Sequence, residues 1–273
     1  MSLSSQAPRA RYGLIIPSSN RMAEPHACRY TPAGVVPHIA RLRMTGPYFM
    51  TLDALLPKVA EAAATLADAK CNPIVFHCTA NSMAEGVDGE RRIAGAIADA
   101  TGAKATTTAA ATMAALDRLG ARRIVLVSPY ERATHEHELD FMEQVGIEVV
   151  GERNLGLSGS DAYCGMPPAD WIEIMAGMKN DRADAYFVSC ANIRATEAIE
   201  EMEARLGRPV LTSNQLVIWQ ALRLAGIDEA VPGLGRLAEA AEAVARERTT
   251  EGNRARRTGG NDKTEFTDRE DYR

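Results

Sequence analysis

Short apolar runs alternate with longer amphipathic segments along this chain. The runs predict buried strands at 12–16, 35–42, 74–78, 123–127, 148–150, 185–190 and 209–212. The amphipathic segments predict helices at 52–69, 89–100, 109–119, 133–145, 169–178, 194–206, 213–224 and 234–248. Strands that alternate with helices indicate an α/β protein with parallel sheets. In such sheets ligands bind beyond the carboxyl ends of the strands.

The chain also contains an internal repeat. Several residues of the first half recur 112 residues later: Pro17 with Pro129, Gly34 with Gly146, and Cys78 with Cys190 (190 − 78 = 112). After the cysteines the offset falls to 106, between Gly120 and Gly226 (226 − 120 = 106). The first copy therefore carries six extra residues (112 − 106 = 6), which we place around 82–92.

The repeat predicts two pseudo-symmetric lobes, each a parallel-sheet α/β sandwich, with the active site in the cleft between them. The first lobe is expected at 12–120, completed by 226–248, and the second at 121–225. Residues 1–11 are expected to form a flexible N-terminus. The segment 249–273 is charged and nearly free of aliphatic residues, which is typical of a disordered tail.

The composition of the chain argues against several classes of function. A net charge of −5 without a basic stripe argues against nucleic acid, and no apolar run approaches the roughly 20 residues that span a bilayer. Residues 1–11 lack the apolar stretch of a signal peptide, and five cysteines in 273 residues do not form a disulfide framework. We therefore expect a cytoplasmic protein that binds a small molecule, not nucleic acid or a membrane.

The repeated cysteines are the candidate chemical groups. A lone cysteine that closes an apolar strand is most often a core residue, but the equivalence of Cys78 and Cys190 in the repeat favours function. Each is predicted to follow a strand and precede a helix, whose N-terminal potential lowers a thiol pKa. Such a thiolate is a nucleophile or base, and a neutral thiol donates a proton. Cys28, Cys71 and Cys164 have no repeat partner and are interpreted as structural or incidental.

Four motifs occur in order: Gly13-Leu14-Ile15-Ile16-Pro17-Ser18-Ser19-Asn20, Cys78-Thr79, Ser128-Pro129-Tyr130 and Ser189-Cys190. From about residue 12 to 237, this set resembles the aspartate/glutamate racemase superfamily, in the branch that contains maleate cis-trans isomerases and arylmalonate decarboxylases. The resemblance implies two pseudo-symmetric α/β lobes with the site between them, no metal or organic cofactor, and a homo-oligomer.

The resemblance also implies roles for single residues. Cys78 would act as nucleophile or base and Cys190 as proton donor. The substrate-binding residues implied are Ser18, Asn20, Thr79, Tyr130, Ala191 and Asn192. Among them, the Asn20 amide would bind a substrate carboxylate, the Tyr130 hydroxyl would donate a hydrogen bond, and Thr79 with its neighbouring N–H groups would hold a carboxylate or the enediolate charge.

The function that follows is a cofactor-independent isomerase of a small (di)carboxylic acid, similar to maleate isomerases. The alternatives are a racemase of an amino acid or hydantoin, a decarboxylase of a substituted malonate, and a ligand-binding sensor without turnover. In the decarboxylases only the second cysteine is kept, so Cys78 counts against that activity. Arg21 and the loop 157–160, which lacks an asparagine, depart from the isomerase pattern and favour a larger or differently charged acid than maleate.

Other polar residues are interpreted structurally. His77 is predicted to be a packed or partly exposed histidine that does not activate Cys78, because neighbouring residues on a strand point to opposite faces. His135 and His137 lie two apart in a predicted helix and share no face, and no zinc spacing is present, so metal binding is not expected. Threonines 106–108 align roughly with 212–214, and their hydroxyls are predicted to cap the helices that follow.

Overall fold

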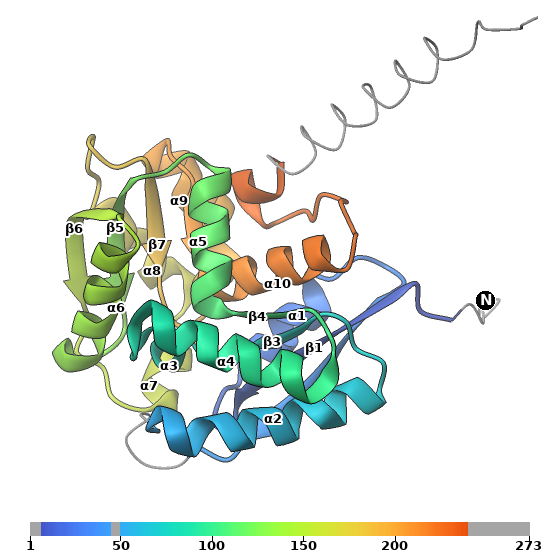
Figure 1. The fold of residues 1–273 in the computed structure, drawn as a ribbon. Helices are drawn as coiled ribbons and strands as arrows, with labels where there is room; N and C mark the ends of the chain where they lie inside the picture. The colour runs from blue at the N-terminus through green and yellow to red at the C-terminus, as the bar shows by residue number, and fades with distance from the viewer. Residues whose placement is uncertain (1–6, 45–49, 240–273) are drawn as a thin grey trace, which may run out of the picture.

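The computed structural model describes residues 7–44 and 50–239. Within them the chain forms two four-stranded parallel sheets with helices around them (Figure 1). The first sheet has the order β2-β1-β3-β4, with β1 (Ala10–Pro17), β2 (Val35–Leu42), β3 (Ile74–Phe76) and β4 (Ala105–Thr107). The second has the order β6-β5-β7-β8, with β5 (Arg123–Ser128), β6 (Glu148–Asn154), β7 (Ala185–Val188) and β8 (Val210–Thr212). The predicted pseudo-symmetric α/β fold is confirmed.

The strand pairing has the same register in both sheets. Leu14 on β1 pairs with Val75 on β3, and Leu126 on β5 pairs with Phe187 on β7. Both residues of the second pair stand 112 positions after those of the first (126 − 14 = 112). The repeat is thus a structural duplication that holds residue by residue through the central strands.

The alignment of the threonines is corrected by one residue. Phe76 pairs with Thr107, and Val188 pairs with Thr212, so Thr107 is the counterpart of Thr212 (212 − 107 = 105). Each of these two threonines caps the next helix: the Thr107 hydroxyl accepts the N–H of Ala110 at 3.0 Å, and the Thr212 hydroxyl accepts that of Gln215 at 3.4 Å. The predicted capping role is confirmed.

Helices α2 (Leu52–Asp68) and α4 (Gly86–Thr101) cover one face of the first sheet (Figure 1). They bury a cluster that includes Ile15, Phe76 and Ile97. Helix α4 has 16 residues, whereas α9 (Ile199–Leu206), which follows the second cysteine, has 8 and is preceded by a 3-10 turn at Ala195–Ala198. The longer helix accommodates the extra residues of the first copy.

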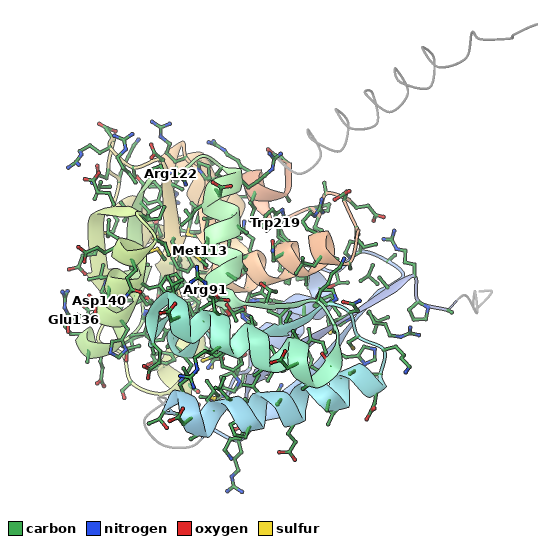
Figure 2. All side chains as sticks on the ribbon, in the orientation of Figure 1. Arg91, Met113, Arg122, Glu136, Asp140 and Trp219 are labelled. Carbon is green, nitrogen blue, oxygen red and sulfur yellow. The ribbon has the colours of Figure 1, made fainter. Side chains whose placement is uncertain are left out.

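The opposite faces of the two sheets share one core. Helices α5 (Thr108–Arg118) and α10 (Ser213–Leu224) pack against each other between the sheets, with Trp219 on α10. A single buried cluster contains Leu14 and Ile16 of the first sheet and Leu126 and Phe187 of the second. Charged side chains such as Arg122, Glu136 and Asp140 lie on the exposed surface (Figure 2). The lobes are therefore joined by apolar packing as well as by the chain.

The remaining helices are α6 (Arg132–Gln144) and α8 (Pro168–Ala176), which were predicted, and three short ones, which were not: α1 (Ala23–Arg29), α3 (Thr79–Met83) and α7 (Ser160–Gly165). A helix of five to seven residues is too short to give a periodic apolar pattern. Both central strands also end earlier than predicted, so that Cys78 and Cys190 each lie two residues beyond a strand, in the loops at its carboxyl end.

Strand β1 begins at Ala10, two residues earlier than predicted. The segment after Gly226 contacts both lobes: Glu229 pairs with Arg9 at the start of the first, and the Arg236 N–H donates to Glu203 of the second. Residues 235–239 are helical. Residues 1–6, the rest of the helix predicted at 234–248 and the tail predicted at 249–273 lie outside the described residues. Over the described ranges, no helix is both long and apolar enough to cross a membrane.

Candidate active site

A cavity of about 500 Å³ opens where the carboxyl ends of both sheets meet. Both repeated cysteines line it. The lining residues are Pro17, Ser19, Asn20, Cys78, Thr79, Ala80, Tyr130, Glu131, Thr134, Ser158, Gly159, Ser160, Tyr163, Cys190, Ala191 and Asn192. The structure therefore brings together every residue expected at the site except Ser18. That side chain lies outside the lining, where its hydroxyl accepts the N–H of Met44 at 3.3 Å, and Ser19 lines the cavity instead.

Cys78 belongs to the first lobe and is partly exposed. Its backbone is extended, with φ −145° and ψ 106°, and it directly precedes the short helix α3. Its thiol donates to the side-chain oxygen of Asn81 at 3.4 Å. The sulfur thus sits beside the first turn of a helix, whose N–H groups have no partner within that helix.

Cys190 belongs to the second lobe and is 4% exposed. Its φ is +111°, a left-handed value that only one other non-glycine among the described residues shares. The sulfur accepts the N–H of Asn192 at 3.3 Å, and the N–H of Cys190 donates to the Ser213 hydroxyl at 3.1 Å. The two cysteines are equivalent in sequence but not in backbone conformation.

The expectation that helix termini lower both thiol pKa values is wrong for this structure. Burial raises the pKa of Cys78 to about 11 and that of Cys190 to about 12. Only Cys78 directly precedes a helix, and the turn after Cys190 begins at Ala195. Loss of hydration outweighs the few polar contacts that each sulfur makes. Both groups are thiols in the empty site at neutral pH.

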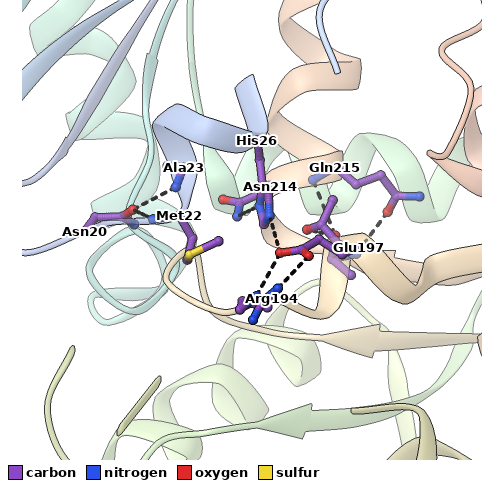
Figure 3. Close-up of polar contacts among 10 residues, drawn as sticks. Asn20, Met22, Ala23, His26, Arg194, Glu197, Asn214 and Gln215 are labelled. Carbon is purple, nitrogen blue, oxygen red and sulfur yellow. Dashed lines mark hydrogen bonds and ion pairs between the residues drawn. The ribbon is translucent and has the colours of Figure 1, made fainter. Parts of the chain in front are cut away.

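Asparagine side chains join the lobes at the rim. The Asn20 amide donates to the carbonyl of Ala191 at 3.0 Å, and its oxygen accepts the N–H groups of Met22 and Ala23 at the start of α1 (Figure 3). In return, the Asn192 oxygen accepts the N–H of Arg21 at 2.8 Å. One amide hydrogen of Asn20 remains for a ligand, because a primary amide has two.

Two tyrosines form one wall. Tyr130 is 6% exposed and meets Tyr163 edge to face, with ring centroids 5.7 Å apart. Burial, together with the neighbouring Cys190 thiol, raises the pKa of Tyr130 well above its usual value. The phenol therefore stays protonated and can donate a hydrogen bond to an oxygen of a ligand.

A buried carboxyl group lies behind the thiols. Glu138 on α6 is fully buried, and one of its oxygens accepts the hydroxyl of Ser189, which directly precedes Cys190. The other oxygen has no hydrogen-bond partner and lies 4.0 Å from His135 Nδ1. Burial raises the pKa of Glu138 to about 8, so the group is mostly neutral at pH 7. If ionised, it would raise the pKa of both Cys78 and Cys190.

His77 is packed, as predicted, and its ring contacts no cysteine. Its Nδ1 lies 2.9 Å from the Thr108 hydroxyl, and its Nε2 lies 2.7 Å from the side-chain oxygen of Asn214. The Asn214 amide in turn meets His26 at 2.7 Å, and His26 lies 3.5 Å from Glu197 (Figure 3). Burial lowers the pKa of His77 to about 4 and also lowers that of His26. This hydrogen-bonded chain crosses between the lobes beneath the site and ends at Glu197, whose pKa is lowered by the hydrogen bond from Arg194.

Several residues at the site were not singled out by the sequence. Thr134 and Tyr163 line the cavity but lie in no recognisable pattern, and Ser19 lines it although the opening motif assigned it no role. The loop 158–160, which lacks the asparagine of the isomerase pattern, also lines the cavity. Glu138 and Ser213 carry no sequence signal either, because a polar residue on a helix is normally solvated. Arg21 lies at the rim, where it pairs with Asp161 of the other lobe. Among the described residues, no group of three or more His, Cys, Asp or Glu could hold a metal ion.

Comparison with known proteins agrees with this arrangement. A maleate isomerase of Pseudomonas putida KT2440 is 30% identical over 83% of this chain and 96% of the relative, and an arylmalonate decarboxylase of Bordetella bronchiseptica is 29% identical over 85% and 98%. A Nocardia farcinica maleate cis-trans isomerase, solved as a cysteine-to-serine mutant with a covalently bound succinylcysteine intermediate, superimposes with a TM-score of 0.77 at 26% identity, covering 84% of this chain and 98% of the other.

Two like sheets and one cavity lined by a thiol from each half define a pseudo-symmetric α/β protein with a two-cysteine site. The model of the arylmalonate decarboxylase family matches residues 13–238, which is most of the chain. The chain belongs to this family, and the resemblance inferred from its motifs is confirmed.

Proposed function

We propose that this protein is a cofactor-independent isomerase that converts a small cis-dicarboxylic acid to its trans form, with maleate as the first substrate to test. The observation that carries the proposal is the pair of thiols, Cys78 and Cys190, which line one cavity from opposite lobes. Relatives named maleate isomerases share the fold over most of the chain. A covalent succinylcysteine on one of them is the adduct expected when a cysteine adds to maleate.

The two thiols have different roles in the proposed reaction. In the reactive form Cys78 is a thiolate and Cys190 a thiol. The Cys78 sulfur adds to one alkene carbon, the π electrons move toward the carboxylate on the other carbon, and Cys190 protonates that carbon. The single carbon–carbon bond then rotates. The Cys190 thiolate removes the proton again, the carbon–sulfur bond breaks, and the trans diacid leaves with Cys78 restored as a thiolate.

Burial supports this assignment of roles. Cys190 is 4% exposed and Cys78 is partly exposed, so burial opposes ionisation more strongly at Cys190. Cys78 therefore loses its proton first and becomes the nucleophile, while Cys190 keeps a proton to donate. The start of α3 and the free amide hydrogen of Asn20 offer donors to a substrate carboxylate, and Tyr130 offers its hydroxyl.

The first cysteine separates isomerase from decarboxylase. Decarboxylation of a malonate needs one acid to protonate the carbanion left by carbon dioxide, which a single thiol can supply. Addition to a double bond needs a nucleophile as well. Because Cys78 lines the cavity, the site holds both groups. The missing asparagine in loop 157–160 remains a reason to test diacids larger than maleate.

The test is turnover of maleate and of substituted malonates, hydantoins and amino acids, followed by proton NMR in deuterated buffer. We expect fumarate from maleate, no product from Cys78→Ser, and a trapped covalent adduct on Cys78 in Cys190→Ser, identified by mass spectrometry of the peptide. Cys28→Ser, an exposed thiol away from the cavity, is the matched control and should keep wild-type turnover.

Other outcomes would reassign the activity. Deuterium incorporated at a stereocentre of an amino acid or hydantoin would identify a racemase, and carbon dioxide released from a malonate would identify a decarboxylase. Binding without conversion of any compound would identify a sensor. Conversion of maleate that survives Cys78→Ser would contradict the mechanism.

We also propose that the protein acts in the cytoplasm as a homo-oligomer. All five cysteines are free thiols, which suits a reducing compartment. Light scattering on the purified protein measures the oligomeric state directly, and a monomer at micromolar concentration would contradict that part of the proposal.

A further inference from the structure

One buried hydroxyl group connects the two halves of the site. Ser213 is the first residue of α10 and is fully buried. Its oxygen accepts the Thr79 hydroxyl of the first lobe at 2.8 Å and the N–H of Cys190 in the second lobe at 3.1 Å. Ser213 does not line the cavity, yet it contacts the neighbour of one thiol and the peptide of the other.

The corresponding residue of the first lobe does something else. With the offset of 105 residues that relates β4 to β8, Ser213 corresponds to Thr108 (213 − 105 = 108). The Thr108 hydroxyl contacts the His77 ring at 2.9 Å and the carbonyl of Phe76 at 3.5 Å, and not the peptide of Cys78. The two copies therefore differ at this position, and only the second uses a hydroxyl to hold the peptide of its cysteine.

The backbone of Cys190 needs such an anchor. A non-glycine residue at φ +111° lies in a sparsely populated region of backbone conformation, which persists only when the surroundings hold it there. Three bonds hold this turn: from the Cys190 N–H to Ser213, from the Asn192 N–H to the Cys190 sulfur, and from the Asn20 amide to the Ala191 carbonyl. Of these, only the bond to Ser213 holds the peptide N–H of Cys190 itself. Cys78 has an extended backbone and needs no equivalent.

We propose that Ser213 is a positioning residue, whose hydroxyl holds the strained peptide of Cys190 and the Thr79 side chain at a fixed separation across the lobe junction. Its catalytic consequence rests on the proposed function. The Thr79 hydroxyl donates its only hydrogen to Ser213, so the substrate carboxylate meets the N–H groups at the start of α3 rather than that hydroxyl. The Cys190 thiol is aimed at the cavity by the turn that Ser213 anchors.

The test compares Ser213→Ala with Thr196→Val. Thr196 is a similarly buried residue of the second lobe, and its hydroxyl lies 2.9 Å from that of Thr212, which does not line the cavity. Both variants lose a buried hydrogen bond, but only Ser213→Ala frees the Cys190 peptide. Ser213→Cys replaces the hydroxyl group by a slightly larger and weaker acceptor and serves if the alanine variant does not fold.

The first readout needs no substrate. Each variant is treated with iodoacetamide, and labelling of Cys190 and Cys78 is followed in the same sample by peptide mass spectrometry. We expect Ser213→Ala to label Cys190 several-fold faster relative to Cys78 than the wild type does, because the released turn exposes the sulfur. Thr196→Val should keep the wild-type ratio. An unchanged ratio in Ser213→Ala would overturn the positioning role.

The second readout is turnover at a temperature where all variants are folded. We expect kcat of Ser213→Ala to fall about 10- to 100-fold, since displacement of a catalytic group by about 1 Å can reduce the rate that much. KM should change less, and Thr196→Val should match the wild type. If the wild type converts none of the acids, the proposed function fails while the labelling ratio still decides the role of Ser213. Wild-type kcat in Ser213→Ala would refute the catalytic consequence.

Discussion

Glu138→Gln is the substitution whose effect follows most directly from the structure. The wild-type carboxyl group is fully buried on α6, bonded to Ser189 through one oxygen and without a hydrogen-bond partner at the other. Burial raises its pKa from the usual value of 4.5 to about 8. Glutamine has nearly the same shape and does not titrate, so the pair of proteins isolates the effect of this one proton.

The sign and the size follow from proton linkage. Between pH 4.5 and about 8 the unfolded chain has lost this proton, while the folded protein keeps it. The group's contribution to the free energy of unfolding is therefore complete below pH 4.5 and decreases by about 1.4 kcal/mol per pH unit up to about pH 8. Over this window the loss reaches about 5 kcal/mol, an order-of-magnitude figure.

The glutamine variant should lack this slope. Its amide oxygen can accept the Ser189 hydroxyl, but its NH₂ group has no acceptor in place of the unpartnered oxygen, which costs about 1–3 kcal/mol at every pH. We expect Glu138→Gln to be less stable than the wild type at pH 5 and more stable at pH 8.5. The two curves of unfolding free energy against pH should cross between these values.

Urea denaturation of both proteins at half-unit steps from pH 5 to pH 9 measures the curves. The control is Glu143→Gln, the same substitution at an exposed position on the same helix. Parallel curves for wild type and Glu138→Gln over the whole range would refute the reasoning, since they would mean that Glu138 binds no extra proton in the folded state.

Two further predictions concern the thiols and the lobe junction. At pH 7 and without substrate, Cys78 should react with iodoacetamide more slowly than free cysteine, because burial raises its pKa to about 11 and leaves less thiolate. The reaction rate should rise with pH up to about that pKa. A rate that stops rising near pH 8 would contradict the raised pKa of Cys78. Asn214→Leu should lower the free energy of unfolding by about 2–5 kcal/mol, because it leaves one ring nitrogen each of the buried His26 and His77 without a partner. Asn180→Leu, at a partly buried amide within the second lobe, should cost less. Equal losses in chemical denaturation would argue against a special role of the interlobe chain.

The sequence predicted most of the fold because the information was local or repeated. Apolar runs located seven of the eight strands in the described residues; β4 (Ala105–Thr107), which has three residues and two threonines, was missed. The offset of 112 residues between Cys78 and Cys190 matches the register of the central strands in both sheets. Helix α10 was predicted at its observed bounds, since it has a long apolar pattern and begins after a threonine cap. Short helices such as α1 and α3 were missed because less than two turns gives no period.

The same repeat located the site. In a parallel sheet the carboxyl ends of the strands lie at one edge. Two equivalent cysteines, each just beyond a central strand, therefore line the same cleft when the two lobes face each other. Asn20, Thr79, Tyr130, Ala191 and Asn192 were assigned through the family resemblance, and all line the cavity. Ser18 was assigned in the same way but points to Met44, because adjacent residues in a loop need not face the same side.

Only the tertiary structure decided the protonation of the site. A pKa depends on how much water the neighbouring segments exclude, and this cannot be read from the residues next to a cysteine. The helix-terminus argument predicted lowered values for Cys78 and Cys190, whereas packing of both lobes around the sulfurs raises them. The contacts of Glu138 with Ser189 and of Ser213 with Thr79 join residues 51 and 134 positions apart. The sequence by itself thus determined which groups meet at the cleft. The folded lobes determined the protonation and the orientation of these groups, because burial and long-range hydrogen bonds exist only after the two halves have packed together.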